Sequence, residues 1–127
     1  MGNPFVHVEL NTTHLDQAKA FYQGLFDWKL SEMPLPVAGA DASGEVYLTI
    51  DPSGGTGGGM MRQMMPDAPS SWLAYVYVSD IRESTEKARL LGATVLKDVS
   101  EVLGMGWLSI LSDPTGALFG LWQPMAA

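Results

Sequence analysis

Cysteine is absent from this chain of 127 residues, and basic side chains are few. Without thiols the protein forms no disulfide, and a thiolate metal site or a cysteine nucleophile is excluded. Seven Lys and Arg stand against fourteen Asp and Glu, which gives a formal net charge of −7 at pH 7. Because such a chain repels phosphate groups, we expect no nucleic acid among its partners.

Long apolar runs are missing too, so no membrane partner is expected. The first ten residues, MGNPFVHVEL, contain no basic segment and lead directly into an alternating run, which indicates no signal peptide. Together with the absence of cysteine, this favours a reducing, cytoplasmic location. A chain of this length buries about two thirds of its unfolded surface, so it can build a core without cross-links.

Two stretches of the sequence, 8–30 and 74–96, repeat one pattern at an offset of 66 residues. Each starts with an apolar extended run, passes a small polar residue, continues as a short amphipathic helix and ends in another extended run. The apolar helix positions are Leu15, Ala18, Tyr22 and Leu25 in the first copy, and Ile81, Ser84, Ala88 and Leu91 in the second. This spacing places each set on one helical face, so the chain contains two copies of one module.

Each module is expected to run strand, helix and three strands, which makes the fold α+β. The expected strands are 5–10, 27–33, 45–51, 60–65 with its glycine-rich lead-in, 72–78, 94–98, 107–111 and 118–122. Thr13 is expected to cap the first helix, and Asp80 the second with Glu83 in capping-box spacing. Residues 100–106 are expected to form a loop, and Gly92 to end the second helix. We expect one domain, 1–127, with module one at about 1–65, a linker at 66–71 and module two at about 72–127.

The first expected strand, FVHVEL, has two unlike faces. Alternation puts Val8 and Leu10 on an aliphatic face suited to packing against a helix. His7 and Glu9 lie on the other face, which must meet solvent or a polar cavity because burying ionisable groups unpaired is costly. His7 is therefore a candidate general base near neutral pH or a polar residue that lines a cavity, and the resemblance described below adds a third interpretation, a metal ligand. Glu9 beside it makes a proton-relay pair possible.

Four features carry a resemblance to a known superfamily. They are His7, the run Phe21-Tyr22-x-x-Leu25-Phe26-x-Trp28, the strand Gly57 to Met60, and Asp113-Pro-x-Gly116. The chain resembles the vicinal oxygen chelate superfamily of glyoxalase I, extradiol dioxygenases and bleomycin-resistance proteins. More narrowly it is similar to a bacterial glyoxalase-like subgroup, although Asp27 stands where that subgroup has Gly. The resemblance implies two βαβββ modules that form a curled mixed sheet around a cavity, with the helices on the outer face.

The resemblance also implies where a metal would bind, because family enzymes hold a divalent ion through the first and last strands of each module. These positions correspond to His7, Gly59, Leu73 and Gly120, so one of four carries a donor. Glu9 is a possible substitute, but two ligands from one strand do not make a tight site. The expected cofactor is therefore none, or a weakly bound divalent metal such as Zn, Ni, Mn or Fe.

Aromatic residues give candidates for binding a small organic ligand. These are Tyr47, Tyr75, Tyr77, Trp107 and Trp122, for which ordinary packing is the alternative. No phosphate-binding glycine loop and no nucleophile elbow is present.

Two functions from different classes follow from the sequence. One is a glyoxalase-related lyase, isomerase or dioxygenase-like enzyme that acts on a small carbonyl compound between the modules, with His7 and Glu9 as its catalytic residues. The other is a metal-free protein of the bleomycin-resistance type that binds or sequesters a small molecule. A third metal donor near His7, from 41–45, would favour the enzyme. The resemblance also implies a homodimer.

Overall fold

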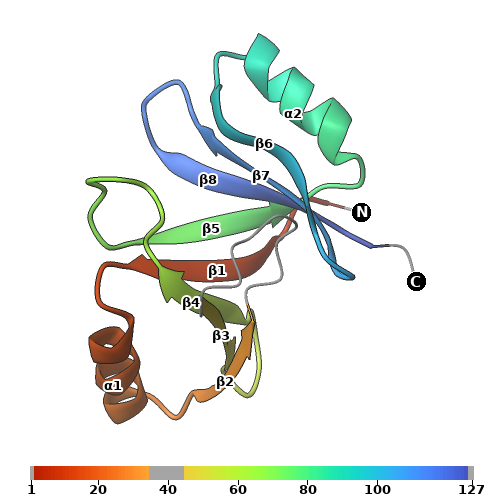
Figure 1. Cartoon of the computed structure of the whole chain (residues 1–127). Helices are drawn as coiled ribbons and strands as arrows, with labels where there is room; N and C mark the ends of the chain where they lie inside the picture. The colour runs from red at the N-terminus through yellow and green to blue at the C-terminus, as the bar shows by residue number, and fades with distance from the viewer. Residues whose placement is uncertain (1, 35–44, 126–127) are drawn as a thin grey trace. The chain divides into compact units, whose positions relative to one another are not determined.

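The computed structural model describes residues 2–34 and 45–125, which contain two helices and eight strands (Figure 1). The first module holds β1 (Phe5–Thr12), α1 (Leu15–Leu25), β2 (Lys29–Pro34), β3 (Val46–Asp51) and β4 (Gly58–Arg62). The second holds β5 (Ser71–Tyr77), α2 (Ile81–Leu90), β6 (Thr94–Val102), β7 (Gly106–Ser112) and β8 (Leu118–Pro124). The element order confirms the predicted pair of βαβββ modules. Neither helix is long and apolar enough to cross a membrane.

The strand order is the same within each module. The first module runs β2-β3-β4-β1 and the second runs β6-β7-β8-β5. The first and last strands of a module, β1 with β4 and β5 with β8, are parallel. The other pairs within each module are antiparallel. The α+β class with mixed pairing is therefore confirmed.

The described residues group into two compact units. Residues 7–34 and 45–73 form one unit, and 2–6 with 74–125 form the other. The start of the chain joins the second module through hydrogen bonds to Tyr77, whose N–H donates to the Pro4 carbonyl at 2.9 Å. The Asn3 side chain donates to the Tyr77 carbonyl, also at 2.9 Å.

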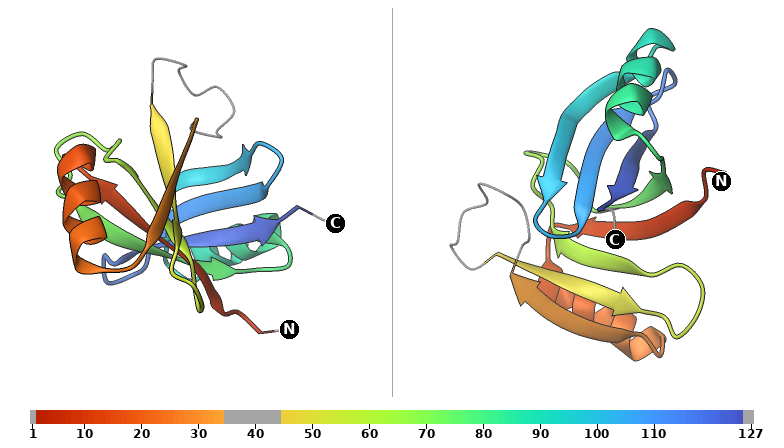
Figure 2. Two further views of the ribbon diagram at one scale, coloured as in Figure 1. Left: turned by 90° about the horizontal axis from the view of Figure 1, so that it is seen from below. Right: turned by 90° about the vertical axis from the view of Figure 1, so that its right-hand side faces the viewer.

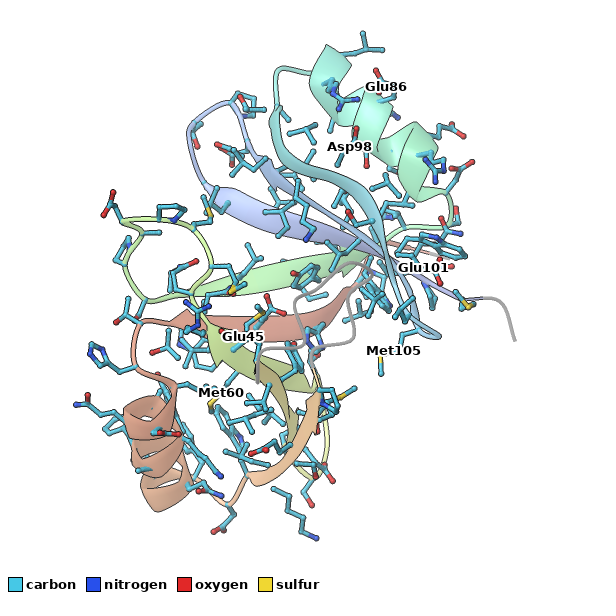
Figure 3. All side chains as sticks on the ribbon, in the orientation of Figure 1. Glu45, Met60, Glu86, Asp98, Glu101 and Met105 are labelled. Carbon is cyan, nitrogen blue, oxygen red and sulfur yellow. The ribbon has the colours of Figure 1, made fainter. Side chains whose placement is uncertain are left out.

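In the first module the core lies between α1 and one face of the strands. Its buried residues are Leu10, Leu48, Ile50 and Met60, the last of which is labelled in Figure 3. Leu15, Ala18 and Tyr22 of α1 pack against them, as their helical spacing predicts. Leu25, the fourth predicted position, is 57% exposed.

In the second module α2 covers β6, β7 and β8, and the views in Figure 2 show each helix beside the strands of its own module. The core consists of Val78, Ile81, Leu111 and Leu121. The Thr85 and Ser109 hydroxyls, both buried, lie 3.0 Å apart between α2 and β7.

Local signals located the second helix better than the first. Asp80 accepts a hydrogen bond from the Glu83 N–H at 3.1 Å, and Gly92 follows the helix at φ +104°, as predicted. The predicted cap of α1 by Thr13 is wrong, because His14 is the N-cap residue and makes no side-chain cap bond. The Thr13 hydroxyl instead lies 3.1 Å from the ring of His14 and 3.3 Å from the Ser70 hydroxyl.

Two strands end differently from the prediction. β6 continues to Val102, where a loop was expected from residue 100, because it pairs with β7 across two register shifts. β4 ends at Arg62 rather than at residue 65. Most of the predicted loop at 34–44 lies outside the described residues.

Candidate acid–base site

The site begins with the alternation of β1. Leu10 points into the core under α1, so His7 and Glu9 point to the opposite face of the strand. Tyr47 of β3 reaches the same two residues, since Leu48 after it belongs to the core and Tyr47 faces the other way. All of these residues lie in the first module's compact unit.

A hydrogen-bonded chain joins the three side chains. The Tyr47 hydroxyl donates to Glu9 Oε1 at 2.9 Å and lies 2.7 Å from His7 Nε2. A phenol has one proton to donate, so when it goes to Glu9 the phenol oxygen must accept from His7. His7 is therefore protonated on Nε2, and in its neutral form the lone pair lies on Nδ1. Asn11 Nδ2 adds a longer bond of 3.4 Å to Glu9 Oε2.

Burial sets the electrostatics of the site. Burial lowers the pKa of His7 from its ordinary value of 6.5, because the imidazolium form loses hydration. Glu9 is only 8% exposed, and hydrogen bonds from Tyr47 and Asn11 offset the cost of burying its carboxylate. The result at neutral pH is an uncharged imidazole linked through a phenol to a carboxyl group.

Tyr47 occupies the space that a side chain at Gly59 would need. A Cβ atom at Gly59 would lie 2.0 Å from the Tyr47 hydroxyl oxygen and 2.2 Å from its ring. Gly59 is paired with Glu9 across β1 and β4. The glycine thus lets the phenol reach between His7 and Glu9.

The second module repeats this arrangement, a tyrosine ring that fills the space beside a strand glycine, with other residues. Gly120 pairs with Tyr75, and a Cβ atom there would lie 2.3 Å from the Tyr75 ring. Tyr75 is buried, with 3% of its surface exposed. Leu73, which the resemblance equates with His7, is 5% exposed. Both glycines at candidate ligand positions are therefore covered by tyrosine rings.

Among the described residues, the donors do not fit a divalent metal ion. Within 2–34 and 45–125, no three His, Asp or Glu side chains come close enough together to hold one. The hydroxyl of Tyr47 already lies between His7 and Glu9. Glu45, a predicted source of a third donor and labelled in Figure 3, binds Arg62 through bonds of 2.6, 2.9 and 3.1 Å. Asp41 lies outside the described residues.

The remaining aromatic candidates belong to the second module and fall on two faces. Tyr77 and Trp122 are register partners, two residues beyond Tyr75 and Gly120, so these residues share one face. Trp107 lies on the other face, where it packs against the core under α2 and lines a pocket with Arg82. The unit that contains His7 includes none of these four aromatic candidates, which are Tyr75, Tyr77, Trp107 and Trp122.

Sequence reasoning missed two parts of the site. Tyr47 was a candidate for binding a ligand, but its link to His7 and Glu9 was not foreseen, and Asn11 was not singled out. The available signal was Gly59, because a strand glycine often marks a close approach of another group. The identity of that group depends on the pairing of β3 with β4, which the sequence pattern does not give.

Comparison with known proteins agrees with this fold. The model of the glyoxalase-like domain family matches residues 7–122. A Mycobacterium tuberculosis protein named "Putative glyoxylase CFP32" is 33% identical over 125 residues, which are 91% of this chain and 44% of that protein. The "Anthracycline biosynthesis protein DauV" of Streptomyces is 24% identical over 129 residues, with 91% and 45% covered. The chain thus spans somewhat under half the length of these relatives.

Among solved structures, methylmalonyl-CoA epimerase from Mycobacterium tuberculosis matches with a TM-score of 0.69 and 16% identity. The match covers 96% of this chain and 88% of the epimerase. At this identity the likeness concerns the fold. The family model covers nearly all of the described sequence, and the chain belongs to the glyoxalase-like domain family.

Proposed function

We propose that the protein catalyses proton transfer on a small carbonyl compound, with His7 as the base and without a metal ion. The observation that carries the proposal is the hydrogen-bonded chain from His7 through Tyr47 to Glu9. A neutral histidine near physiological pH is suited to accept a proton from carbon. This activity is the isomerase or lyase branch of the sequence hypothesis.

His7, Tyr47 and Glu9 have different roles in this reaction. The C–H bond next to the substrate carbonyl breaks, and its proton goes to the imidazole ring of His7. The C–H electron pair forms a C=C bond to the carbonyl carbon, while the C=O π pair moves to the oxygen and gives an enolate. The imidazolium that forms is positively charged, and the nearby carboxyl group of Glu9 stabilises it through the Tyr47 phenol. Tyr47 is thus a positioning residue, which fixes the tautomer of His7. Return of the proton to the same or a neighbouring atom gives exchange or isomerisation.

The relatives support this class of chemistry as an analogy. An enzyme of similar fold is named an epimerase, and epimerisation next to a carbonyl is a proton transfer. A relative that is 33% identical over 125 residues carries a glyoxylase name. Neither name identifies the substrate of this chain, which we define only as a small compound with an acidic C–H next to a carbonyl.

Deuterium exchange tests the proposal. Purified protein is incubated in D₂O with 2-oxo acids, α-hydroxyketones and acyl thioesters, and the loss of the α-proton signal is followed by NMR. The wild type should accelerate exchange of at least one class. His7→Gln should lower the rate by about 10²- to 10⁴-fold, the usual contribution of a general base. Tyr47→Phe should lower it by about 10- to 100-fold, as expected for one hydrogen bond to a charged group.

Matched controls separate this effect from damage to the fold. His14→Gln changes the other histidine, which is exposed at the start of α1, and should leave the rate unchanged. Tyr22→Phe removes a phenol on the helix side of the sheet and should do the same. Equal loss in Tyr22→Phe and Tyr47→Phe would count against the relay.

The alternative function is that of a metal-free binding protein. The filled positions at Gly59 and Gly120 favour it, because both lack a donor and both are covered by a tyrosine ring. Calorimetry distinguishes the two proposals. Saturable binding of a carbonyl compound with no exchange of its α-proton would support sequestration and reject catalysis.

Partners and location remain proposals drawn from the sequence. We propose a small-molecule ligand, a homodimer and a cytoplasmic location. Sedimentation velocity of the purified chain tests the dimer directly, since a homodimer would have about twice the 13.7 kDa mass of the chain.

A further inference from the structure

A second pocket lies in the first module, away from His7. It has a volume of about 300 Å³ and is lined by Val8, Trp28, Ile50, Pro52, Thr56 and Trp72, together with two glycine backbones. All of its residues belong to one compact unit. Its volume is at the lower end of the range found for small-molecule sites.

The pocket and the acid–base site use opposite faces of β1. Val8 lines the pocket, and alternation along the strand directs it away from His7 and Glu9. Ile50 belongs to the core that packs against α1. A ligand in this pocket therefore does not touch the His7 network.

Two tryptophans form adjacent walls of the pocket. The ring centres of Trp28 and Trp72 are 6.3 Å apart, and their planes meet at 80°. Tyr22 stacks on Trp28 at 5.7 Å and meets Trp72 edge-on at 5.5 Å, so a third ring holds both indoles in place. A fixed corner of two nearly perpendicular indoles lets a flat molecule stack on one ring and place its edge against the other, two arrangements that aromatic rings prefer.

The charge and exposure of the lining restrict what binds there. None of the lining side chains is ionisable, and Thr56 supplies the one hydroxyl. A charged ligand would lose hydration without gaining an ion-pair partner in this pocket. Trp72 is 41% exposed, so a ligand would cover apolar surface that now meets water.

We propose that this pocket binds a small, uncharged, planar aromatic molecule of one or two fused rings. The ring stacks on one indole and places its edge against the other. Thr56 at the exposed side offers one hydrogen bond to a polar substituent. The proposal is independent of the proton-transfer function, because it rests on other residues.

The test uses N-phenyl-1-naphthylamine, a neutral aromatic probe whose fluorescence rises in apolar surroundings. The wild type should bind it saturably, with energy transfer from tryptophan to the probe. Trp72→Ala should weaken binding at least tenfold. Thr56→Glu puts a carboxylate at the exposed side without altering the core, and a bound apolar probe would dehydrate it. This variant should also weaken binding, and it serves if Trp72→Ala does not fold. His7→Gln should bind as the wild type does.

Phe21→Ala is the matched control. Phe21 is 60% exposed and contacts Tyr22 edge-on, but it does not line the pocket. Its removal should leave probe affinity within twofold. Non-saturable binding, or an equal loss of probe affinity in Phe21→Ala and Trp72→Ala, would show nonspecific binding to exposed apolar surface and overturn the proposal. Displacement of the probe as the chain self-associates would assign the pocket to a second copy and overturn it too.

Discussion

His7 shows how one hydrogen bond fixes the chemistry of a side chain. Tyr47 donates its proton to Glu9, so the His7 ring must donate from Nε2 to the phenol. We predict the Nε2–H tautomer of neutral His7 at pH 7. Nitrogen-15 chemical shifts of the two histidines measure this, with His14 as the internal reference. An Nδ1–H tautomer would mean that the phenol donates to His7 and not to Glu9.

The pH dependence of the reaction follows from the burial of His7. Burial lowers the pKa of His7 below 6.5, so the neutral base persists to a lower pH than in an exposed histidine. We predict that the acid limb of the exchange rate lies below pH 6.5 and disappears in His7→Gln. The unfolded chain binds a proton more readily than the folded one, so stability should fall as pH drops below 6.5. An acid limb above pH 6.5 would contradict this assignment.

The buried hydroxyl pair of the second module makes a separate prediction. Thr85 and Ser109 are 1% and 0% exposed, and their hydroxyls lie 3.0 Å apart. Thr85→Val should cost about 1–3 kcal/mol, because it leaves the Ser109 hydroxyl buried without that bond. The double variant with Ser109→Ala should cost less than the two single variants added together. Urea denaturation measures all three, and strict additivity would show that the hydroxyls do not interact.

At the scale of single residues, the sequence predicted part of the site. Alternation in FVHVEL placed His7 and Glu9 on one face, away from Leu10, and the structure has them there. It did not predict Tyr47 as their link, because that contact joins residues 38 and 40 positions apart. Pairing between distant strands decides such contacts, and local periodicity carries no information about it.

Among the elements, β4 illustrates why a glycine stands where a side chain is expected. Gly59→Ala should destabilise the protein by about 1–3 kcal/mol, since its Cβ would overlap the Tyr47 ring. The matched control is Gly24→Ala in α1, where a Cβ meets nothing within 4 Å. That change should stabilise the protein by about 0.5–1 kcal/mol.

A double-mutant cycle shows whether the overlap is the cause. In a Tyr47→Ala background the ring is gone, so Gly59→Ala should cost much less than in the wild type. Thermal melts of the four proteins measure the difference. An unchanged cost would place the strain in the backbone and not at the tyrosine.

The elements themselves followed from the sequence where local signals were strong. The capping box at Asp80 and the glycine after α2 gave both ends of that helix. The start of α1 was displaced by one residue, because Thr13 bonds to Ser70 from a distant part of the chain instead of capping. The extension of β6 to Val102 likewise depends on its partner β7, so composition alone suggested a loop.

For the whole molecule, the internal repeat predicted two βαβββ modules, and the structure confirms them. The structure adds that both modules have the same strand order. The two modules differ at the positions that form the acid–base site. His7 and Glu9 in the first copy correspond to Leu73 and Tyr75 in the second at the 66-residue offset. The polar network is therefore confined to one module. A symmetrical metal site built from both modules would instead need donor side chains in the second copy as well.

The rate of α-proton exchange by protein treated with a chelator tests the central claim most directly. The assay compares stripped wild-type protein with the same protein supplied with Zn²⁺, Ni²⁺, Mn²⁺ or Fe²⁺. We predict equal exchange with and without metal, and loss of exchange in His7→Gln under both conditions. Exchange that appears only when metal is added, with about one equivalent bound and none in His7→Gln, would contradict a metal-independent base at His7.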